Sequence, residues 1–430
     1  MEEVIEKVAV KKEVQVDSSQ ATFVTSGPVP SSSMSRSVTL LFSVACGMSV
    51  ANIYFAQPLL DHLAREFGID YSAIGSLITI TQIFYAVGLL MLVPLGDFLN
   101  QRRLITGQML LSVIALVMVG TASNSTVLFA GIALVGLLAV VTQTLVAFAA
   151  TLASPEKRGQ VVGVVTSGIV IGILLARAFS GVLTDLSGWR SVYLVSAALM
   201  LLMVCVLFRV LPNIEREKQL QRLSYPRLLR SVFMLLAQER ILRIRSVLAM
   251  LIFAAFSIMW TPLVLPLSAA PLSLSHTAIG AFGLAGVAGA LGAARAGKLA
   301  DRGLGQWTTG IGLTLLLLSW LPMSYIEQSL FVLVIGIVLL DLAVQAVHVT
   351  NQSFIFTLRT EARSRITGGY MVFYSIGVAS GSITSTYAYA HYGWDGVCLL
   401  GASVSALALL FWAMTSRVKA ATEKGSVPNK

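Results

Sequence analysis

The residues of this chain best suited to proton chemistry interrupt one apolar run, at 329–353. Asp341 is followed by Gln345, His348 and Gln352 at offsets of four, seven and eleven residues. At about 100° per residue of an α-helix, all four fall within roughly 60° of one another, on one face. A carboxyl group and an imidazole two turns apart can pass or share a proton. We hypothesise that Asp341 couples transport to protons and that His348 is its relay or a substrate contact; the alternative is a structural polar cluster.

Arg177 is the basic residue placed deepest inside an apolar run. A charged group in hydrocarbon costs at least about 2.5–3.5 kcal/mol at the helix centre on insertion scales, so it is retained for a reason. Arg177 can pair with an acidic group or bind an anionic part of a substrate. It can also extend outward to lipid headgroups.

Neutral polar and aromatic residues interrupt several other runs. Singly, such residues more often join neighbouring helices than contact a ligand. Together they predict a cavity that is partly aromatic and able to form hydrogen bonds. The expected cavity residues are Asn52, Tyr54, Gln57, Gln82, Gln143, Arg177, Trp260, Gln345 and Gln352.

Signatures of catalysis are missing from the sequence. It contains no nucleotide-binding P-loop, no His/Cys group with metal-ligand spacing, and no nucleophile with a base and oxyanion donors in a water-facing loop. We therefore expect no enzyme, no cofactor and no metal, and no direct use of ATP.

The composition indicates which elements position these residues. Of 430 residues, 56% are hydrophobic and 12% are charged, whereas a soluble domain carries about 25% charged residues. Apolar runs of about 20 residues, each long enough to cross a bilayer as a helix, recur along the chain. The predicted fold is an all-α polytopic membrane protein with twelve transmembrane helices. The runs cover 38–60, 73–96, 104–122, 127–150, 160–183, 191–210, 246–268, 277–297, 307–325, 329–353, 366–388 and 396–415.

Lys and Arg gather in alternate loops, which predicts the orientation. If the N-terminus is cytoplasmic, the outer loops hold only Arg65 and Arg190, as the positive-inside rule requires. The net charge of +10 then follows from topology, so we expect no nucleic-acid partner. We expect an inner (plasma) membrane protein with both termini cytoplasmic. The expected units are a disordered cytoplasmic tail, a six-helix bundle, a basic linker, a second six-helix bundle and a tail, at 1–37, 38–210, 211–245, 246–415 and 416–430.

The two bundles are related by an internal repeat. The Ala-Ile-Gly string at 73–75 recurs at 278–280, and the Gly-Trp pair at 188–189 recurs at 393–394, both 205 positions later. Parallel six-span repeats are a transporter architecture, in which the substrate site lies between the halves near the midplane.

The loop at 297–305 reads GKLADRGLG. It resembles the loop signature of the major facilitator superfamily, G-x-L-x-D-R-x-G-R-R, at Gly297, Leu299, Asp301 and Arg302. An acidic residue beside an arginine at a helix end can form a charge latch that holds one conformation and breaks in another. The resemblance implies a gating role for this loop.

The first-half copy of that loop, at 93–103, reads VPLGDFLNQRR. It keeps Asp97, Arg102 and Arg103, for which the resemblance implies the same gating role. It lacks the leading glycine and the arginine that follows the aspartate.

The fifth run also resembles the family, in its antiporter signature G-x8-G-x3-G-P-x2-G-G. Gly163, Gly172, Ala176 and Gly181 stand at matching positions, although Ala176 and Arg177 replace the expected Gly-Pro pair. Small residues at such spacing let helices pack closely, so we expect these four to serve helix packing.

The resemblance covers about residues 38–415. It implies two six-helix bundles and a secondary active transporter that moves a small organic solute by alternating access, with proton-coupled efflux as the expected mode. The expected partners are the solute, protons and the lipid bilayer, and we expect a monomer. The alternatives are an importer or uniporter of the same fold, and a membrane sensor or scaffold that does not transport.

Overall fold

The computed structural model describes residues 35–97, 99–154, 157–212, 225–287, 289, 295–296, 299–356, 358 and 363–424. The described residues form helices joined by turns and loops, and they contain no β-strand. The tail expected at 1–37 lies almost wholly outside the described residues, as do residues 425–430.

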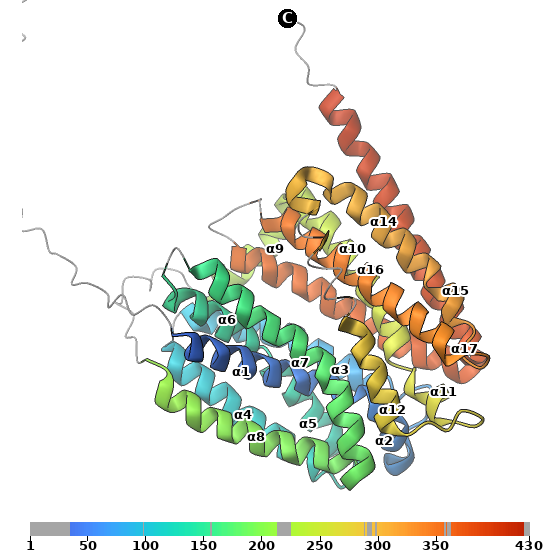
Figure 1. Cartoon of the computed structure of the whole chain (residues 1–430). Helices are drawn as coiled ribbons and strands as arrows, with labels where there is room; N and C mark the ends of the chain where they lie inside the picture. The colour runs from blue at the N-terminus through green and yellow to red at the C-terminus, as the bar shows by residue number, and fades with distance from the viewer. Residues whose placement is uncertain are drawn as a thin grey trace, which may run out of the picture.

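The first half of the chain forms one bundle, drawn in blue to green in Figure 1. In it α1 packs along α7, and α4 packs against α5 and α8. Helix starts are set by side-chain caps, since Ser35, Asn100 and Asn124 each accept a hydrogen bond from a backbone N–H of the first turn. The elements are α1 (Arg36–Tyr54), η1 (Gln57–Leu59), α2 (Leu60–Phe67), α3 (Ser76–Met91), η2 (Val93–Asp97), α4 (Gln101–Gly120), α5 (Ser125–Leu138), α6 (Val141–Leu152), α7 (Arg158–Ser187) and α8 (Trp189–Val210).

The second half forms a second bundle, drawn in yellow to red in Figure 1. Here α10 packs along α17, and α14 packs against α16. The elements are α9 (Tyr225–Gln238), α10 (Arg240–Trp260), α11 (Val264–Ser268), α12 (His276–Ala281), η4 (Phe282–Ala285), the π-turn η5 (Ala300–Leu304), α14 (Gly305–Leu318), α15 (Trp320–Met323), α16 (Leu330–Phe356) and α17 (Arg363–Lys424).

Two breaks distinguish these helices from the predicted runs. The first run is not one helix, because η1 carries Pro58 and separates α1 from α2; proline lacks the N–H that would continue the helix. The last two runs form the single element α17, which turns at Gly393 where φ is 63°. A left-handed conformation of this kind favours glycine.

The described part of the linker expected at 211–245 is largely helical. Within it lies α9, and α10 already begins at Arg240, before the expected start at residue 246. Val232 and Leu235 of α9 are buried, with α9 packed on α17 and α10. Phe233 and Met234 of the same helix are exposed; an exposed apolar face on a basic segment is typical of a helix lying along a membrane surface.

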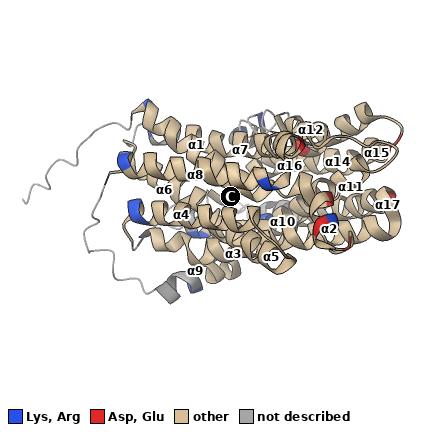
Figure 2. Ribbon diagram, turned by 90° about the horizontal axis from the view of Figure 1, so that it is seen from below, with Lys and Arg blue, Asp and Glu red and all other residues tan. Residues whose placement is uncertain are grey.

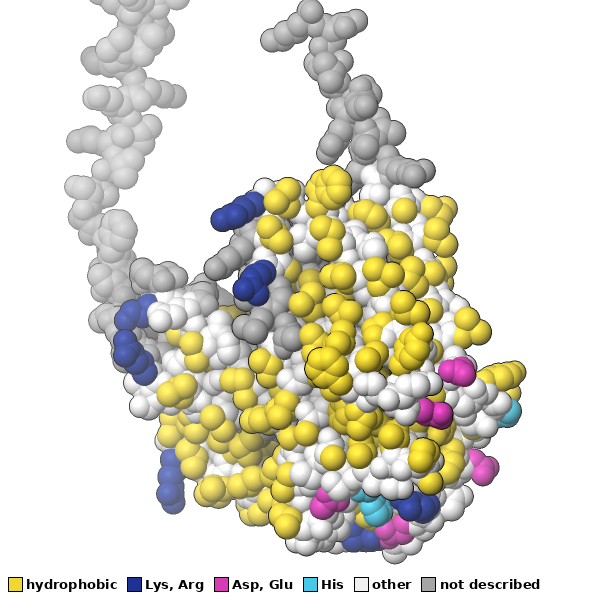
Figure 3. Space-filling view, turned by 45° about the vertical axis from the view of Figure 1, so that its right-hand side comes forward, with side chains coloured by type: hydrophobic (Ala, Val, Ile, Leu, Met, Phe, Trp, Pro, Cys, Tyr) yellow, Lys and Arg dark blue, Asp and Glu magenta, His cyan; other side chains and the backbone are white. Residues whose placement is uncertain are grey.

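The length and the apolar composition of the helices indicate a membrane protein. Among the described residues, ten helices are long and apolar enough to cross a bilayer. One of these is the double element α17, and the predicted run at 277–297 is described only in part. Figure 3 shows an apolar belt with charged side chains toward the ends of the molecule. The observations agree with the predicted twelve-helix fold.

The two ends of the bundle differ in charge. Figure 2 shows Lys and Arg near α4 and α6, and Asp and Glu near α2 and α12 at the opposite side. We call these the basic end and the acidic end. The basic end holds Arg102, Arg103, Lys157, Arg209 and Arg240, and the acidic end holds Asp61, Glu66, Asp70 and Asp185.

The most extensive contacts between the halves are those of α3 with α17 and of α7 with α12. Gly75, at the start of α3, packs against Ser382 of α17, where a Cβ would lie 2.3 Å from the Ser382 carbonyl oxygen. Gly280 of α12 packs likewise against Arg177 of α7, at 2.4 Å from its carbonyl oxygen. Because Gly75 and Gly280 stand 205 positions apart, as do Arg177 and Ser382, the two contacts are equivalent under the internal repeat. The interface therefore has an approximate two-fold symmetry.

Candidate functional site

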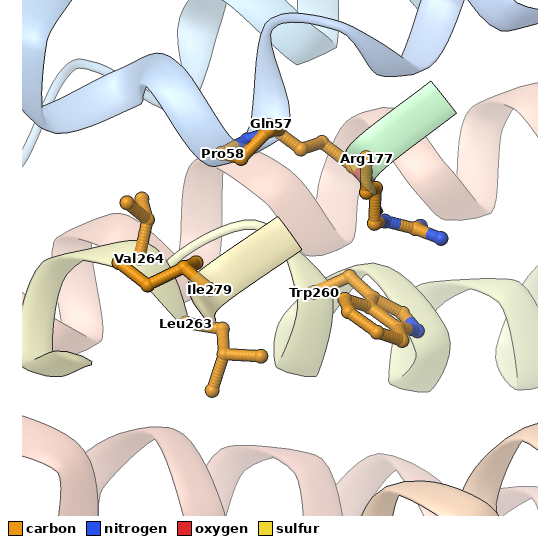
Figure 4. A pocket seen from close by; sticks show the side chains of 7 residues that line it. All are labelled: Gln57, Pro58, Arg177, Trp260, Leu263, Val264 and Ile279. Carbon is orange, nitrogen blue, oxygen red and sulfur yellow. Dashed lines mark hydrogen bonds between the residues drawn. The ribbon is translucent and has the colours of Figure 1, made fainter. Parts of the chain in front are cut away.

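Arg177 lies at the interface between the halves. Its side chain leaves α7 and its guanidinium carbon lies 3.9 Å from the centre of the Trp260 ring of α10, as Figure 4 shows. Its Nε donates a hydrogen bond of 2.9 Å to Gln57 Oε1, and its Nη2 is buried without a hydrogen-bond partner among the described residues. Only 3% of the residue is exposed. The alternative that Arg177 extends to lipid headgroups is therefore wrong.

Asp341 of α16 contacts the N–H of the same indole, within the second half. The Trp260 indole N–H donates to Asp341 Oδ1 at 3.1 Å, and Asp341 is buried in the middle of α16. Arg177 is the basic group whose charge acts on this carboxylate. A buried charge needs an opposite charge and hydrogen-bond donors to be tolerated. Trp260 thus links Asp341 and Arg177, two of the charged residues that the sequence analysis singled out.

A tyrosine pair extends this site toward the basic end. The hydroxyl groups of Tyr54 in α1 and Tyr374 in α17 lie 3.0 Å apart across the interface. The Tyr54 ring centre is 5.3 Å from the Arg177 guanidinium carbon. We call Tyr54, Gln57, Arg177, Trp260, Asp341 and Tyr374 the central cluster. The sequence analysis missed Tyr374, which is one of several tyrosines in the apolar runs and has no other polar residue of the expected cavity beside it in sequence.

A small pocket adjoins the central cluster. It is lined by Gln57, Pro58, Arg177, Trp260, Leu263, Val264 and Ile279 (Figure 4). Its free volume of about 10 Å³ is room for about one water molecule. The halves therefore close tightly around the site on the side that faces the acidic end.

His348 belongs to a second buried network, inside the second half. Its Nδ1 lies 2.8 Å from the Tyr370 hydroxyl, and its Nε2 lies 3.3 Å from Gln352 Nε2. Arg245 joins the same region by donating to Asn351 Oδ1 at 3.1 Å. Arg245 is 4% exposed, although its position among linker cations gave no sign of burial. The structure shows no hydrogen bond between His348 and Asp341 among the described contacts.

The remaining expected cavity residues are distributed among other contacts. Asn52 accepts a hydrogen bond from Ser196 within the first half, at 2.9 Å. Gln143 bonds Tyr85. Gln82 is buried, and its Oε1 has no hydrogen-bond partner among the described groups. Gln345 lies half-buried on α16. None of these four contacts the central cluster through a hydrogen bond that the described residues show.

The four small residues of α7 do not behave alike. A Cβ on Gly172 would lie 2.3 Å from the Gly47 carbonyl oxygen, and one on Gly181 would lie 2.1 Å from that of His276; Ala176 is buried. Gly163 has open space around it, so the expected packing role is wrong there. Gly168, which the sequence analysis did not single out, takes that place against α1.

The expected gating residues are only partly described. Arg102 donates to the carbonyl oxygen of Phe208 and its guanidinium lies 4.6 Å from that ring. Arg103 and Arg302 are exposed. Gly297 and the side chains of Asp97 and Asp301 lie outside the described residues.

A histidine links the halves at the acidic end, which the sequence did not predict. His276, the first residue of α12, places Nε2 3.0 Å from Asp61 Oδ1 of α2. Its backbone N–H donates to Asp185 at the end of α7. Partial burial lowers the pKa of His276, but the hydrogen bond and charge of Asp61 and the charge of Asp185 outweigh it, so the pKa lies above its ordinary value.

Known proteins resemble the chain in sequence and in fold. The uncharacterized transporter YgaY of Escherichia coli O157:H7 is 48% identical over 89% of this chain and 96% of its own length. The multidrug resistance protein MdtG of Proteus mirabilis is 25% identical over 85% and 92%. A bacterial homologue of the human lysosomal transporter Spinster, in an inward-facing and occupied conformation, superposes with a TM-score of 0.72 at 13% identity, covering 89% of this chain and 96% of that one.

The family pattern itself matches nearly the whole described chain. The Major Facilitator Superfamily pattern matches residues 40–310 and 247–430. The all-helical fold of two bundles agrees with that match. The chain belongs to the Major Facilitator Superfamily and is a multi-pass membrane transporter, not an enzyme.

Proposed function

We propose that this transporter is a proton-coupled exporter of small organic solutes in the bacterial inner membrane. The observation that carries the proposal is the contact of Trp260 with both Arg177 and Asp341, at 3.9 Å and 3.1 Å. It places an acid, a base and an aromatic surface at one point between two halves that must separate during alternating access. The similarity to a multidrug resistance protein supports the direction of transport.

In this arrangement a proton and a solute can each change the contact of Trp260 with Arg177 and Asp341. Loading Asp341 with a proton removes its negative charge, which weakens the attraction to Arg177 and the hydrogen bond from Trp260. The free Nη2 of Arg177 can donate to an acceptor on the solute, while the Trp260 ring offers a face for stacking. Because both events change the same contact between halves, binding of one partner alters the equilibrium that governs the other.

The proposal also assigns the orientation of the protein in the membrane and the conformation of the structure. We assign the basic end to the cytoplasm, because cytoplasmic loops carry the excess of Lys and Arg. The described contacts of Gly75, Gly181 and Gly280 between the halves cluster toward the acidic end. The structure then corresponds to a state that is closed to the outside. Both termini would be cytoplasmic, and a monomer contains the complete site.

The test is solute-dependent proton movement in proteoliposomes that hold the purified protein. A pH gradient is imposed, a panel of neutral, anionic and aromatic solutes is added singly, and internal pH is followed. We expect proton movement opposite to the solute with the wild type, and none with Asp341→Asn. The matched control is Asp70→Asn, because Asp70 is exposed at the acidic end.

Different outcomes separate the alternatives. Proton movement in the same direction as the solute would make the protein an importer by symport. Saturable solute exchange without proton movement would make it a uniporter or exchanger. Unchanged coupling in Asp341→Asn would remove this carboxylate from the mechanism.

A further inference from the structure

We propose that the acidic end carries a binding site for a divalent transition-metal ion, with zinc as the best fit, formed across the two halves. Asp61 and His62 of α2 and His276 of α12 each offer one ligand atom, and these atoms lie within 4.8 Å of one another. We call these three residues the histidine cluster. Two imidazoles and one carboxylate are the donor set of zinc sites that keep one position open. Magnesium and calcium prefer oxygen ligands throughout.

The spacing of the donor atoms suits a small ion. His276 Nε2 and Asp61 Oδ1 are 3.0 Å apart, close to the roughly 3.4 Å between two ligands held at about 2.0–2.1 Å around a tetrahedral zinc ion. The rings of His62 and His276 have centres 4.4 Å apart. His62 is only half-buried, so rotation of its side chain can bring its ring nitrogen to the ion.

Two of the proposed ligands, His276 and Asp61, are oriented by contacts with neighbouring side chains. His276 Nδ1 lies 3.5 Å from Asp185 Oδ1, and Asp185 also accepts the backbone N–H of Thr277 at 2.7 Å. A carboxylate on the far nitrogen of a ligating histidine fixes the ring and increases its basicity as a ligand. Arg65 donates to Asp61 Oδ2 at 2.6 Å, which leaves Oδ1 directed at His276.

The site lies just below the surface. The Asp61 and His276 side chains are 2% and 10% exposed, but His62 is only half-buried and Arg65, which holds Asp61, has a side chain that is 61% exposed. Figure 3 shows histidine, acidic and basic side chains together at this end of the molecule. An ion in solution at the acidic end can therefore enter without passing through the membrane-spanning part.

Metal binding here would fasten the two halves together. The histidine cluster bridges α2 of the first half and α12 of the second, and α12 is the helix that packs on α7 at the interface. Alternating access requires this end to open once in each cycle. A bound ion would therefore hold the acidic end closed and arrest transport. This consequence rests on the proposed transport cycle, whereas metal binding itself does not.

Binding is tested on the purified full-length protein, freed of any histidine tag and treated with a chelator, in buffer above neutral pH because the ligands must be deprotonated. Titration calorimetry with zinc chloride is expected to give one saturable site per chain, and magnesium chloride is expected to give none. Both His62→Ala and His276→Ala should abolish this site. Asp185→Asn, a change at a positioning residue, should weaken affinity by about 10–100-fold.

The control variant is His391→Ala. His391 is an exposed histidine in α17, outside the histidine cluster, and its loss should leave zinc binding unchanged. Zinc binding that survives in both His62→Ala and His276→Ala would overturn the site. His62→Ala keeps the contact between His276 and Asp61, so it remains informative if His276→Ala does not fold.

The proposed arrest of transport by bound metal is tested in proteoliposomes, with zinc added at the acidic end. Zinc should inhibit the wild type and the His391→Ala variant, and a chelator should restore transport. The His62→Ala variant should transport equally with and without zinc. If zinc binds to the histidine cluster but leaves transport unchanged, the bound ion does not hold the two halves closed. Because binding is measured without any solute, its failure is distinguishable from failure of the proposed transport function.

Discussion

Arg177 of the first half lies with its guanidinium carbon 3.9 Å from the centre of the Trp260 ring of the second half. This contact ties α7 to α10 through a cation–π interaction, which is worth about 2 kcal/mol or more when it is desolvated. Through its N–H, at the edge of the ring, the same indole donates to Asp341. The central cluster therefore places two buried charged groups, one from each half, against a single side chain.

Replacing Trp260 can separate its two contacts. Trp260→Phe keeps an aromatic face for Arg177 but loses the N–H that Asp341 accepts, and a hydrogen bond to a charged group is worth about 1.5–3 kcal/mol. We expect the initial rate of solute transport to fall about tenfold or more. Trp260→Leu loses both contacts and should transport more slowly still. Equal rates for Trp260→Phe and the wild type would show that the N–H is not used.

Replacing Arg177 by lysine keeps the positive charge and removes the planar guanidinium. The hydrogen bond from Nε to Gln57 and the stacking on Trp260 both depend on that plane. We expect Arg177→Lys to lower solute transport at least about tenfold. Arg190→Lys is the matched control, because Arg190 pairs with Glu66 in a partly exposed position at the acidic end. A normal rate in Arg177→Lys would exclude a role that needs the guanidinium.

Glycine substitutions test how closely the halves approach. A Cβ on Gly280 would lie 2.4 Å from the Arg177 carbonyl oxygen, whereas one on Gly368 meets no atom within 4 Å. Gly368→Ala should therefore be neutral or stabilising by up to about 1 kcal/mol, since alanine favours helices. Gly280→Ala should lower the thermal unfolding midpoint and slow transport. If both variants behave alike, the close contact between α12 and α7 is not part of the resting structure.

The buried Arg245 is expected to stabilise the second half. It donates to Asn351 and Thr309 and lies 3.9 Å from the centre of the Phe354 ring. Arg245→Leu leaves buried acceptors without their donor, which costs about 1–3 kcal/mol. The thermal unfolding midpoint should fall, measured in detergent. Arg243→Leu should change it little, because Arg243 is at the surface and, among the described residues, donates to the Ala237 carbonyl oxygen alone.

The sequence singled out Asp341 and Arg177 because a charge inside an apolar run is costly wherever the run is placed. That argument needs only local composition, and so does the assignment of helices to runs of about 20 apolar residues. The sequence allows Arg177 to reach the lipid headgroups, because the sequence of one helix does not tell which of its sides faces lipid. The structure answers this question, because Arg177 is buried against Trp260 and does not face lipid.

Some residues could not be found from the sequence at all. Asp61, Asp185 and His276 stand at helix ends, where polar residues are ordinary, and they come from three separate elements. Tyr374 and Arg245 carried no signal, since the first is one aromatic residue among many and the second follows other linker cations. Their partners are distant along the chain.

The sequence by itself determined the membrane-spanning helices, the 205-residue repeat and the presence of one acid and one base in the apolar core, because hydropathy, repeated strings and buried charge are properties of local sequence. Only the tertiary structure decided that Arg177 and Asp341 share Trp260, and that His276 meets Asp61 across the interface. The physical reason is that these contacts depend on how two separate bundles pack. That packing is set by glycines such as Gly75 and Gly280, whose role appears only when the opposing helix is in place.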